Sequence, residues 1–455
     1  MRRAEIRPGP VPWARAGIEP KPREPAPSAA KGQRGGTEEP ARSRRPALTY
    51  ALLIFLSCFL ELGLVVDAIV RDRPLGGTFA PLGVGTFASL SAGLGVLLLA
   101  FHVATLLAHL LTVPRLASSG SLALGALLLL AHPGGVVGAG AGVFLARFGL
   151  QHLRNDLKAC LFDKPSGRGL RASLRAEALQ AEGSEPGRRA QTRPDVRYKA
   201  LPRLAGFALA FLYSPPAFAA LSAVTLAAYL RTLISESRGA GELGSMGAGE
   251  QRSGGECSSA PPLLYSLAPR LPRRIYLVMA AHSAHYFAFG YGVPILFARW
   301  YGFPAATLGL IYAAGWIGYY LVSQWLSPSP RAMAWGHLTS ALAILILAAS
   351  LTPGLAPSTS PALALLAWTV TGFGGGTIFM LARLRSANPY DPATMELWDN
   401  GANIVGVLLF LWAWGQGAPA LGFLAAAALA LAAAWLSAGL AGVWFVGWEG
   451  RRVAE

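Results

Sequence analysis

Several polar and aromatic side chains stand out because they interrupt long apolar stretches of the sequence. An ionisable group in an apolar medium costs at least about 3 kcal/mol on membrane-insertion scales, so such residues are candidates for a function. Together they would suit the passage of a proton or the binding of a cation or a hydroxylated solute. The candidates are Glu61, Arg147, Gln151, His282, His285, Tyr286, Tyr312, Trp316, Glu396, Asn400 and Asn403.

Glu61 lies in the middle of an apolar stretch and is the candidate acid for taking up and releasing a proton. Arg147, in a later stretch, is its candidate countercharge. The alternative is that the two residues have separate structural roles.

Glu396, Asn400 and Asn403 are spaced at i, i+4 and i+7, so they share one face of a helix. Such a face would place a carboxylate and two amides along a polar path. The alternative for Glu396 is that it lies in the first turn of the helix, where acids favour the positive end of the helix dipole.

His282, His285 and Tyr286 also share a helical face, and a histidine pair can relay protons or bind a substrate. Hydrogen bonds across helices are the alternative. Tyr312 and Trp316 would stack on a substrate, or belong to the core or to an aromatic belt at the membrane interface. No third ligand accompanies the histidines, and the three cysteines are scattered, so the sequence predicts neither a metal site nor a cofactor.

The composition requires lipid as the solvent for much of the chain. Of its 455 residues, 53% are hydrophobic and 14% are charged, and the mean hydropathy is +0.43. The apolar stretches do not alternate, which predicts helices rather than barrel strands. We expect twelve spans, at residues 48–66, 83–113, 118–131, 136–153, 203–213, 217–234, 275–297, 305–326, 332–351, 363–384, 393–414 and 421–448.

Basic residues fall in every second connection between these spans. With the N-terminus inside, the outer connections hold only Arg71, Arg73 and Arg299, so the positive-inside rule places both termini in the cytoplasm. The short fifth span could instead form one broken helix with the sixth. Merging them would turn every later basic connection outward, which favours twelve spans. The net charge of +16 therefore predicts contact with the anionic cytoplasmic leaflet of a lipid bilayer rather than with nucleic acid.

The spans and connections predict a domain organisation. Residues 1–46 are expected to be a disordered basic cytoplasmic tail, and residues 47–235 an N-terminal bundle of six helices with a cytoplasmic loop at 163–199. Residues 236–271 form the central cytoplasmic linker, residues 272–448 a C-terminal bundle of six helices, and residues 449–455 a cytoplasmic tail.

On these features the chain resembles the major facilitator superfamily of transporters. The resemblance spans residues 46–448 and rests on Phe289-Gly-Tyr-Gly-Val-Pro leading to Thr307-Leu-Gly-Leu-Ile, on Arg147-Phe-Gly-Leu-Gln, and on the central loop. It implies an all-α polytopic membrane protein with two pseudo-symmetric six-helix bundles and a cavity between them.

The resemblance implies secondary active transport of a small solute by alternating access, with protons as a candidate coupling ion, in the plasma membrane of a bacterium. The connection between the second and third spans lacks the usual acidic signature of the family. That departure motivates the alternative of a transporter-like membrane scaffold or assembly factor without transport. An intramembrane enzyme is a third reading, from Asp156 and Asp163, but the spacing does not match a metal-diphosphate site. No nucleotide-binding loop is present, which argues against an ATP-driven pump. The sequence predicts no enzyme and does not reveal the oligomeric state.

Overall fold

The computed structural model describes residues 39–71, 84–131, 135–158, 194–244, 273–325, 329–352, 359–387 and 392–440, and every regular element in these ranges is a helix. The described residues from 41 onward belong to one compact unit. The helices are α1 (Glu39–Arg71), α2 (Val84–Leu110), α3 (Arg115–Ala131), α4 (Gly135–Lys158), α6 (Pro194–Ala208), η2 (Ala210–Leu212), α7 (Pro215–Gly244), α8 (Arg273–Phe289), α9 (Gly292–Arg299), α10 (Ala305–Trp325), α11 (Pro330–Ala349), α12 (Pro361–Ala387), α13 (Pro392–Gly415) and α14 (Pro419–Ala438).

A described helix covers at least part of each predicted span. Seven helical segments are both long and apolar enough to cross a membrane, and they lie in α1, α2, α4, α7, α10, α11 and α14. Two shorter apolar helices, Arg115–Ala131 and Pro361–Gly375, lie on predicted spans as well. The chain is therefore a helical integral membrane protein, whereas the number of twelve spans and the side on which the termini lie stay predictions.

Proline marks the first residue of six of these helices, α6, α7, α11, α12, α13 and α14. The fixed φ of proline suits the first helical position, where the missing N–H has no partner within the helix anyway. The predicted spans begin later because they were placed on apolar residues alone.

Three predicted polar segments are partly helical, which corrects their boundaries. α1 begins at Glu39, inside the predicted tail 1–46, and α6 begins at Pro194, inside the predicted loop 163–199. α7 continues to Gly244, into the predicted linker 236–271. The physical reason is that the backbone hydrogen bonds of a helix do not require apolar side chains, so a helix can extend past the end of its apolar stretch. The other residues of these three segments, and the tail 449–455, lie outside the described residues.

The fifth and sixth spans are separate helices. α6 ends at Ala208, η2 follows, and α7 begins at Pro215, where Ser214 Oγ accepts a hydrogen bond from the backbone N–H of Ala217 at 3.3 Å. The two helices also pack on different partners, α6 on α10 and α7 on α3.

The seventh span is broken near its middle by Pro294. Proline has no N–H to donate to the carbonyl of Gly290, which instead accepts from Val293 N at 3.2 Å. α8 consequently ends at Phe289 and α9 begins at Gly292, with Tyr291 between them.

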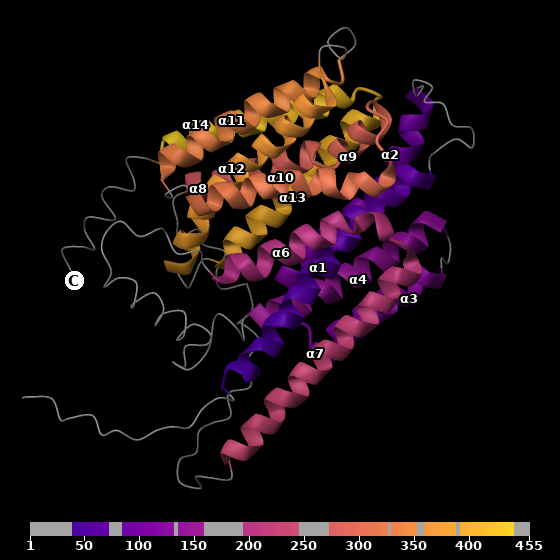
Figure 1. Ribbon diagram of the computed structural model, residues 1–455, viewed down its shortest axis with the longest axis vertical. Helices are drawn as coiled ribbons and strands as arrows, with labels where there is room; N and C mark the ends of the chain where they lie inside the picture. Colours follow the sequence, from indigo (N-terminus) through magenta and orange to yellow (C-terminus); the bar gives the residue numbers. More distant parts are fainter. Residues whose placement is uncertain are drawn as a thin grey trace, which may run out of the picture. The chain divides into compact units, whose positions relative to one another are not determined.

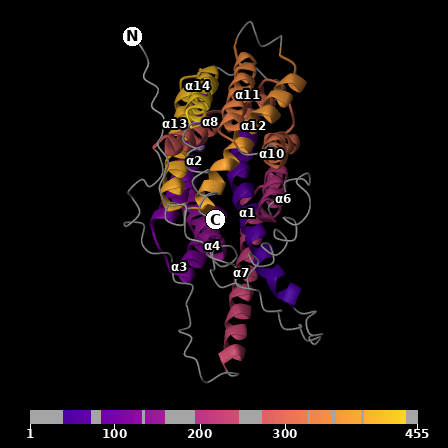
Figure 2. The ribbon, with the colours of Figure 1, turned by 90° about the vertical axis from the view of Figure 1, so that its left-hand side faces the viewer.

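Helix contacts repeat between the first and second parts of the chain. α3 packs on α4 and α7, as α11 packs on α12 and α14, and the pair α2–α4 corresponds to α10–α12. Figures 1 and 2 show α3, α4 and α7 together on one side and α11, α12 and α14 together on the other. We call α1 to α7 the first helix group and α8 to α14 the second. The groups meet along two seams, α2–α13 and α6–α10.

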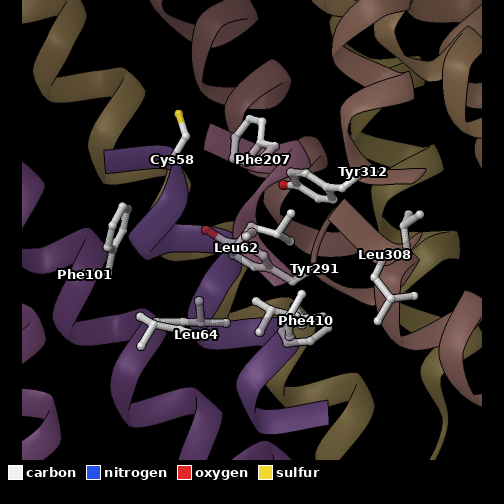
Figure 3. Packing of buried hydrophobic residues seen from close by; sticks show 14 of the residues in the cluster. Cys58, Leu62, Leu64, Phe101, Phe207, Tyr291, Leu308, Tyr312 and Phe410 are labelled. Atoms are coloured by element: carbon white, nitrogen blue, oxygen red, sulfur yellow. The ribbon is translucent and has the colours of Figure 1, made fainter. Parts of the chain in front are cut away.

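A buried apolar core continues across these seams. It includes Leu62 and Phe207 from the first group and Tyr312 and Phe410 from the second. Figure 3 shows these side chains around Tyr291. The core therefore belongs to both groups, and separating them would expose it.

Gly309 allows the close approach of α6 and α10. A Cβ atom at this position would lie 2.7 Å from the carbonyl oxygen of Ala208, which is backbone and cannot rotate away. Gly120 in α3 is a matched helical glycine, because a Cβ there would meet nothing within 4 Å.

We predict that Gly309→Ala lowers the thermal unfolding temperature of the purified protein, because overpacking at the seam costs about 1–3 kcal/mol. Gly120→Ala should leave the temperature unchanged or raise it, because alanine favours the helix by about 1 kcal/mol. Equal unfolding temperatures for the two variants would contradict the tight α6–α10 seam.

Candidate functional site

A chain of three polar groups crosses between the helix groups, and Tyr291 and His102 are buried whereas Glu61 is partly exposed. The hydroxyl of Tyr291, at the α8–α9 break, donates a hydrogen bond to Glu61 Oε1 of α1 at 2.9 Å. His102 Nε2 of α2 lies 2.7 Å from the same hydroxyl. A phenol has one proton, and it goes to Glu61, so His102 Nε2 is the donor in the second contact. Tyr291 is fully buried and His102 is 3% exposed, so water does not compete for the bond between them.

Local sequence explains why these groups meet. The break at Pro294 places Tyr291 between two helices, where its side chain reaches the first group. Phe101, His102 and Thr105 lie within little more than one turn of α2, and each has a polar or aromatic contact in this region.

Arg147 does not form the predicted ion pair with Glu61. Its Nε donates to Thr105 Oγ1 at 2.7 Å, and its guanidinium lies over the Phe101 ring at 4.2 Å from the centroid. None of the ion pairs among the described residues includes Arg147 or Glu61. The reason is that α2 offers a hydroxyl and an aromatic face to Arg147, while Tyr291 takes Glu61.

Glu396 bridges the groups at one end of the α2–α13 seam. Its carboxylate oxygens lie 3.8 Å from His109 Nε2 of α2 and 3.7 Å from Lys158 Nζ of α4. Gln151 joins the cluster, because its Nε2 lies 3.1 Å from His109 Nε2 and donates to Asn155 Oδ1 at 2.9 Å. Glu396 lies beyond the first turn of α13, which begins at Pro392, so its contacts reach other helices.

The other two amides of the predicted face have different surroundings. Asn400 Nδ2 donates to the backbone carbonyl of Glu396 at 2.7 Å, a contact within the helix. Asn403 is 9% exposed, and its Oδ1 has no hydrogen-bond partner.

His282 and His285 lie in a cluster with His337 of α11. His337 Nδ1 is 2.7 Å from the carbonyl of Met333, which can only accept, so Nδ1 carries a proton. His337 Nε2 is then the acceptor for His282 Nδ1 at 3.1 Å. The His285 ring centroid lies 5.0 Å from that of His282. Among the described residues no group of three side chains has the geometry of a metal site.

The predicted aromatic residues lie at the α6–α10 seam. Tyr286 OH donates to Tyr312 OH at 3.1 Å, and Tyr312 is 1% exposed. Trp316 stacks on Phe207 with 5.6 Å between centroids, and Arg203 of α6 lies 4.4 Å above the Trp316 ring. These side chains pack in the interior, so Tyr312 does not belong to an interfacial belt.

The predicted site residues thus form four neighbourhoods rather than one cavity. A pocket of about 430 Å³ lies elsewhere, between the starts of α2 and α4 and the end of α1, and is lined by residues such as Leu64, Asp67 and Tyr213. None of the predicted site residues lines it. His109 and Lys158 lie near the other ends of α2 and α4, so this pocket and the Glu396 bridge lie at opposite ends of those helices.

Sequence reasoning missed Tyr291 and His102 as site residues. The signal for Tyr291 was available in Gly290-Tyr-Gly292 with Pro294, because this pattern breaks a helix inside an apolar span. His102 has no such signal.

Comparison with solved structures identifies the fold. No protein-family model and no curated protein sequence matches this chain. The chain is similar to the crystal structure of an auto-inhibited POT family peptide transporter, with a TM-score of 0.59 and 15% identity over 89% of this chain and 97% of that one. It is also similar to the human organic anion transporter MFSD10, with a TM-score of 0.51 and 16% identity over 88% of this chain and 100% of that one. A peptide transporter POT in complex with sulfate gives a TM-score of 0.51 and 14% identity, over 88% and 94% of the two chains. The chain therefore has the same overall fold as these transporter structures.

We predict that Tyr291→Phe destabilises the protein by about 1–3 kcal/mol, because it leaves the buried His102 and the partly buried Glu61 without this hydrogen-bond partner. Tyr301→Phe is the matched control, since Tyr301 OH donates only a long bond of 3.4 Å to the carbonyl of Thr359. Thermal unfolding of the purified variants measures both effects. A shift for Tyr291→Phe no larger than that for Tyr301→Phe would contradict a central role for this hydroxyl.

Proposed function

We propose that this protein is a secondary active transporter that moves a small solute across a membrane by alternating access, coupled to protons through Glu61. The observation that carries this proposal is the hydrogen-bond chain from Glu61 through Tyr291 to His102, which joins the two helix groups in the interior of a transporter-like fold. In such folds a site between two halves is opened to each side by rocking of one half against the other.

Protonation of Glu61 supplies a physical link between proton binding and this motion. A hydrogen bond to an ionised carboxylate contributes about 1.5–3 kcal/mol, compared with about 0.5–1.5 kcal/mol for a neutral pair. Taking up a proton at Glu61 therefore weakens the bond from Tyr291 and lowers the cost of separating the groups. Releasing the proton restores the contact.

The Glu396 cluster is our candidate for the gate at the cytoplasmic end. It joins α13 to α2 and α4 through His109 and Lys158 at 3.8 and 3.7 Å. Opening this end requires these contacts to break. Gln151, Asn400 and Asn403 would then line the path behind the gate, with Arg147 further in.

The histidine and aromatic neighbourhoods are proposed as a second wall of the path. His282 and His285 lie in α8, and Tyr286, Tyr312 and Trp316 lie beside the α6–α10 seam. We place the protein in the plasma membrane of a bacterium, with both termini in the cytoplasm, on the distribution of its basic residues.

Uptake into proteoliposomes with an imposed pH gradient tests the proposal. Peptides and organic anions are suitable first solutes, because the names of the similar structures mention them. We predict that Glu61→Gln abolishes the dependence of uptake on the gradient, because the amide cannot exchange the proton. Asp67→Asn is the control, since Asp67 pairs with Arg71 at 2.9 Å near the end of α1 and should leave the dependence intact.

Gradient-driven uptake by Glu61→Gln at the rate of the unsubstituted protein would contradict proton coupling through this residue. Absence of protein-dependent flux for every solute tested would contradict transport itself and would favour the scaffold alternative. Purification with one stoichiometric protein partner would then be the expected finding.

A further inference from the structure

Arg147 is a buried cation that forms no direct ion pair with the other side chains that the structure describes. Its side chain is 7% exposed, and its Nε donates a hydrogen bond to Thr105 Oγ1. The Nη1 atom is buried and has no partner. An unpaired guanidinium in an apolar interior is costly, and such groups normally pair with an anion.

The charged groups around Arg147 leave an excess of positive charge. Arg203 faces the ring of Trp316 and belongs to none of the ion pairs of the described residues. Asp67 and Asp156 are paired with Arg71 and Arg115. This leaves Glu61 as the acid of the first group that is not in an ion pair, among the side chains that the structure describes. Arg154, seven residues after Arg147 on α4, also belongs to none of these ion pairs. The three arginines outnumber the carboxylate of Glu61, which favours a ligand that carries a negatively charged group.

Two acceptor atoms without partners accompany this donor. Gln151 lies one helical turn from Arg147 on α4, is fully buried, and has an unpartnered Oε1. Asn403 Oδ1 is also buried and unpartnered.

The register of the seam places Asn403 at the level of His102. α2 and α13 run antiparallel, because Glu396 contacts His109 near one end and a Cβ on Gly95 would meet Leu411 near the other. Asn403 follows Glu396 by seven residues, and His102 precedes His109 by seven. Thr105, which holds Arg147, lies within one turn of His102 on α2. Arg147 from the first helix group and Asn403 from the second therefore lie at similar heights along the α2–α13 seam.

We infer that the solute is a small carboxylate that also carries a hydrogen-bond donor group, either a hydroxyl or an ammonium group. Arg147 binds the carboxylate through its free N–H groups, and Gln151 Oε1 and Asn403 Oδ1 accept hydrogen bonds from the donor group. This inference deepens the proposed function. That the ligand is transported rests on that proposal, whereas binding of the ligand can be tested without transport.

Thermal unfolding of the full-length protein in detergent tests the binding site directly. The probes are lactate, alanine and γ-aminobutyrate, which share a carboxylate and a donor group. Acetate lacks the donor, methyl lactate lacks the charge, and potassium chloride at equal ionic strength reports general salt effects. We expect at least one probe to raise the unfolding temperature in a saturable manner, acetate to act more weakly, and methyl lactate to have no effect.

Arg147→Gln should weaken binding of the active probe by about tenfold or more, because it removes a charge-assisted contact. Gln151→Glu keeps the arginine but adds a repelling carboxylate, so it should have a similar effect. Arg231→Gln, which removes an exposed arginine of α7, is the control and should bind normally. Arg147→Lys keeps the charge without the planar fork and should bind with intermediate affinity, which separates loss of the site from loss of the fold.

No saturable shift with any of the three probes, or an equal shift in Arg147→Gln and the unsubstituted protein, would overturn the inference. Uptake of an uncharged solute without carboxylate binding would overturn it while leaving transport intact. Carboxylate binding without flux of any solute would contradict transport while leaving the site intact.

Discussion

The hydrogen bond from Tyr291 to Glu61 is the contact on which the arrangement of the two helix groups depends. Glu61 lies inside the apolar helix α1 and Tyr291 lies at the α8–α9 break, and the Tyr291 side chain is fully buried in the core that the two groups share. His102 completes the second contact of the same hydroxyl, so three helical segments are held at one point. Removing Tyr291 leaves the buried His102 Nε2 without this partner, which costs more than the bond itself contributes.

Around this point the two seams are packed by complementary means. The α6–α10 seam closes through a glycine against backbone and through stacked aromatic rings. The α2–α13 seam combines apolar contact near Gly95 with polar contact at His109 and Glu396. Apolar contacts can slide and re-form at little cost, whereas the polar contacts are specific to one geometry. A change of charge at Glu61 or Glu396 therefore changes the free energy needed to separate the two helix groups.

Much of the fold was predictable from the sequence because lipid imposes simple rules on length and hydropathy. The predicted spans were matched by helices, and the separation of α6 from α7 followed from counting basic residues. Helix starts were placed too late, although proline at Pro330 or Pro361 gave a usable signal. Length and hydropathy do not predict the structure of the polar connections. The extension of α7 to Gly244 was therefore not expected.

The site was harder to predict, because spacing along one helix does not show what a neighbouring helix presents. The face shared by Glu396 and Asn403 was recognisable from i and i+7 alone. Glu61 and Arg147 form no direct salt bridge among the described residues, because Phe101 and Thr105 of α2 hold the arginine. Tyr291 was visible as part of a helix-breaking pattern, but nothing in the sequence tied it to Glu61, which precedes it by 230 residues.

A double-mutant cycle between Glu61 and Tyr291 tests the central contact most directly. Glu61→Met and Tyr291→Phe remove the two partners singly and together with little change in volume, and equilibrium unfolding gives the free energy of each variant. A hydrogen bond between them predicts a coupling of about 1–3 kcal/mol, so the double variant should lose less stability than the sum of the single variants. Additive losses would show that the two residues do not interact and would contradict this account.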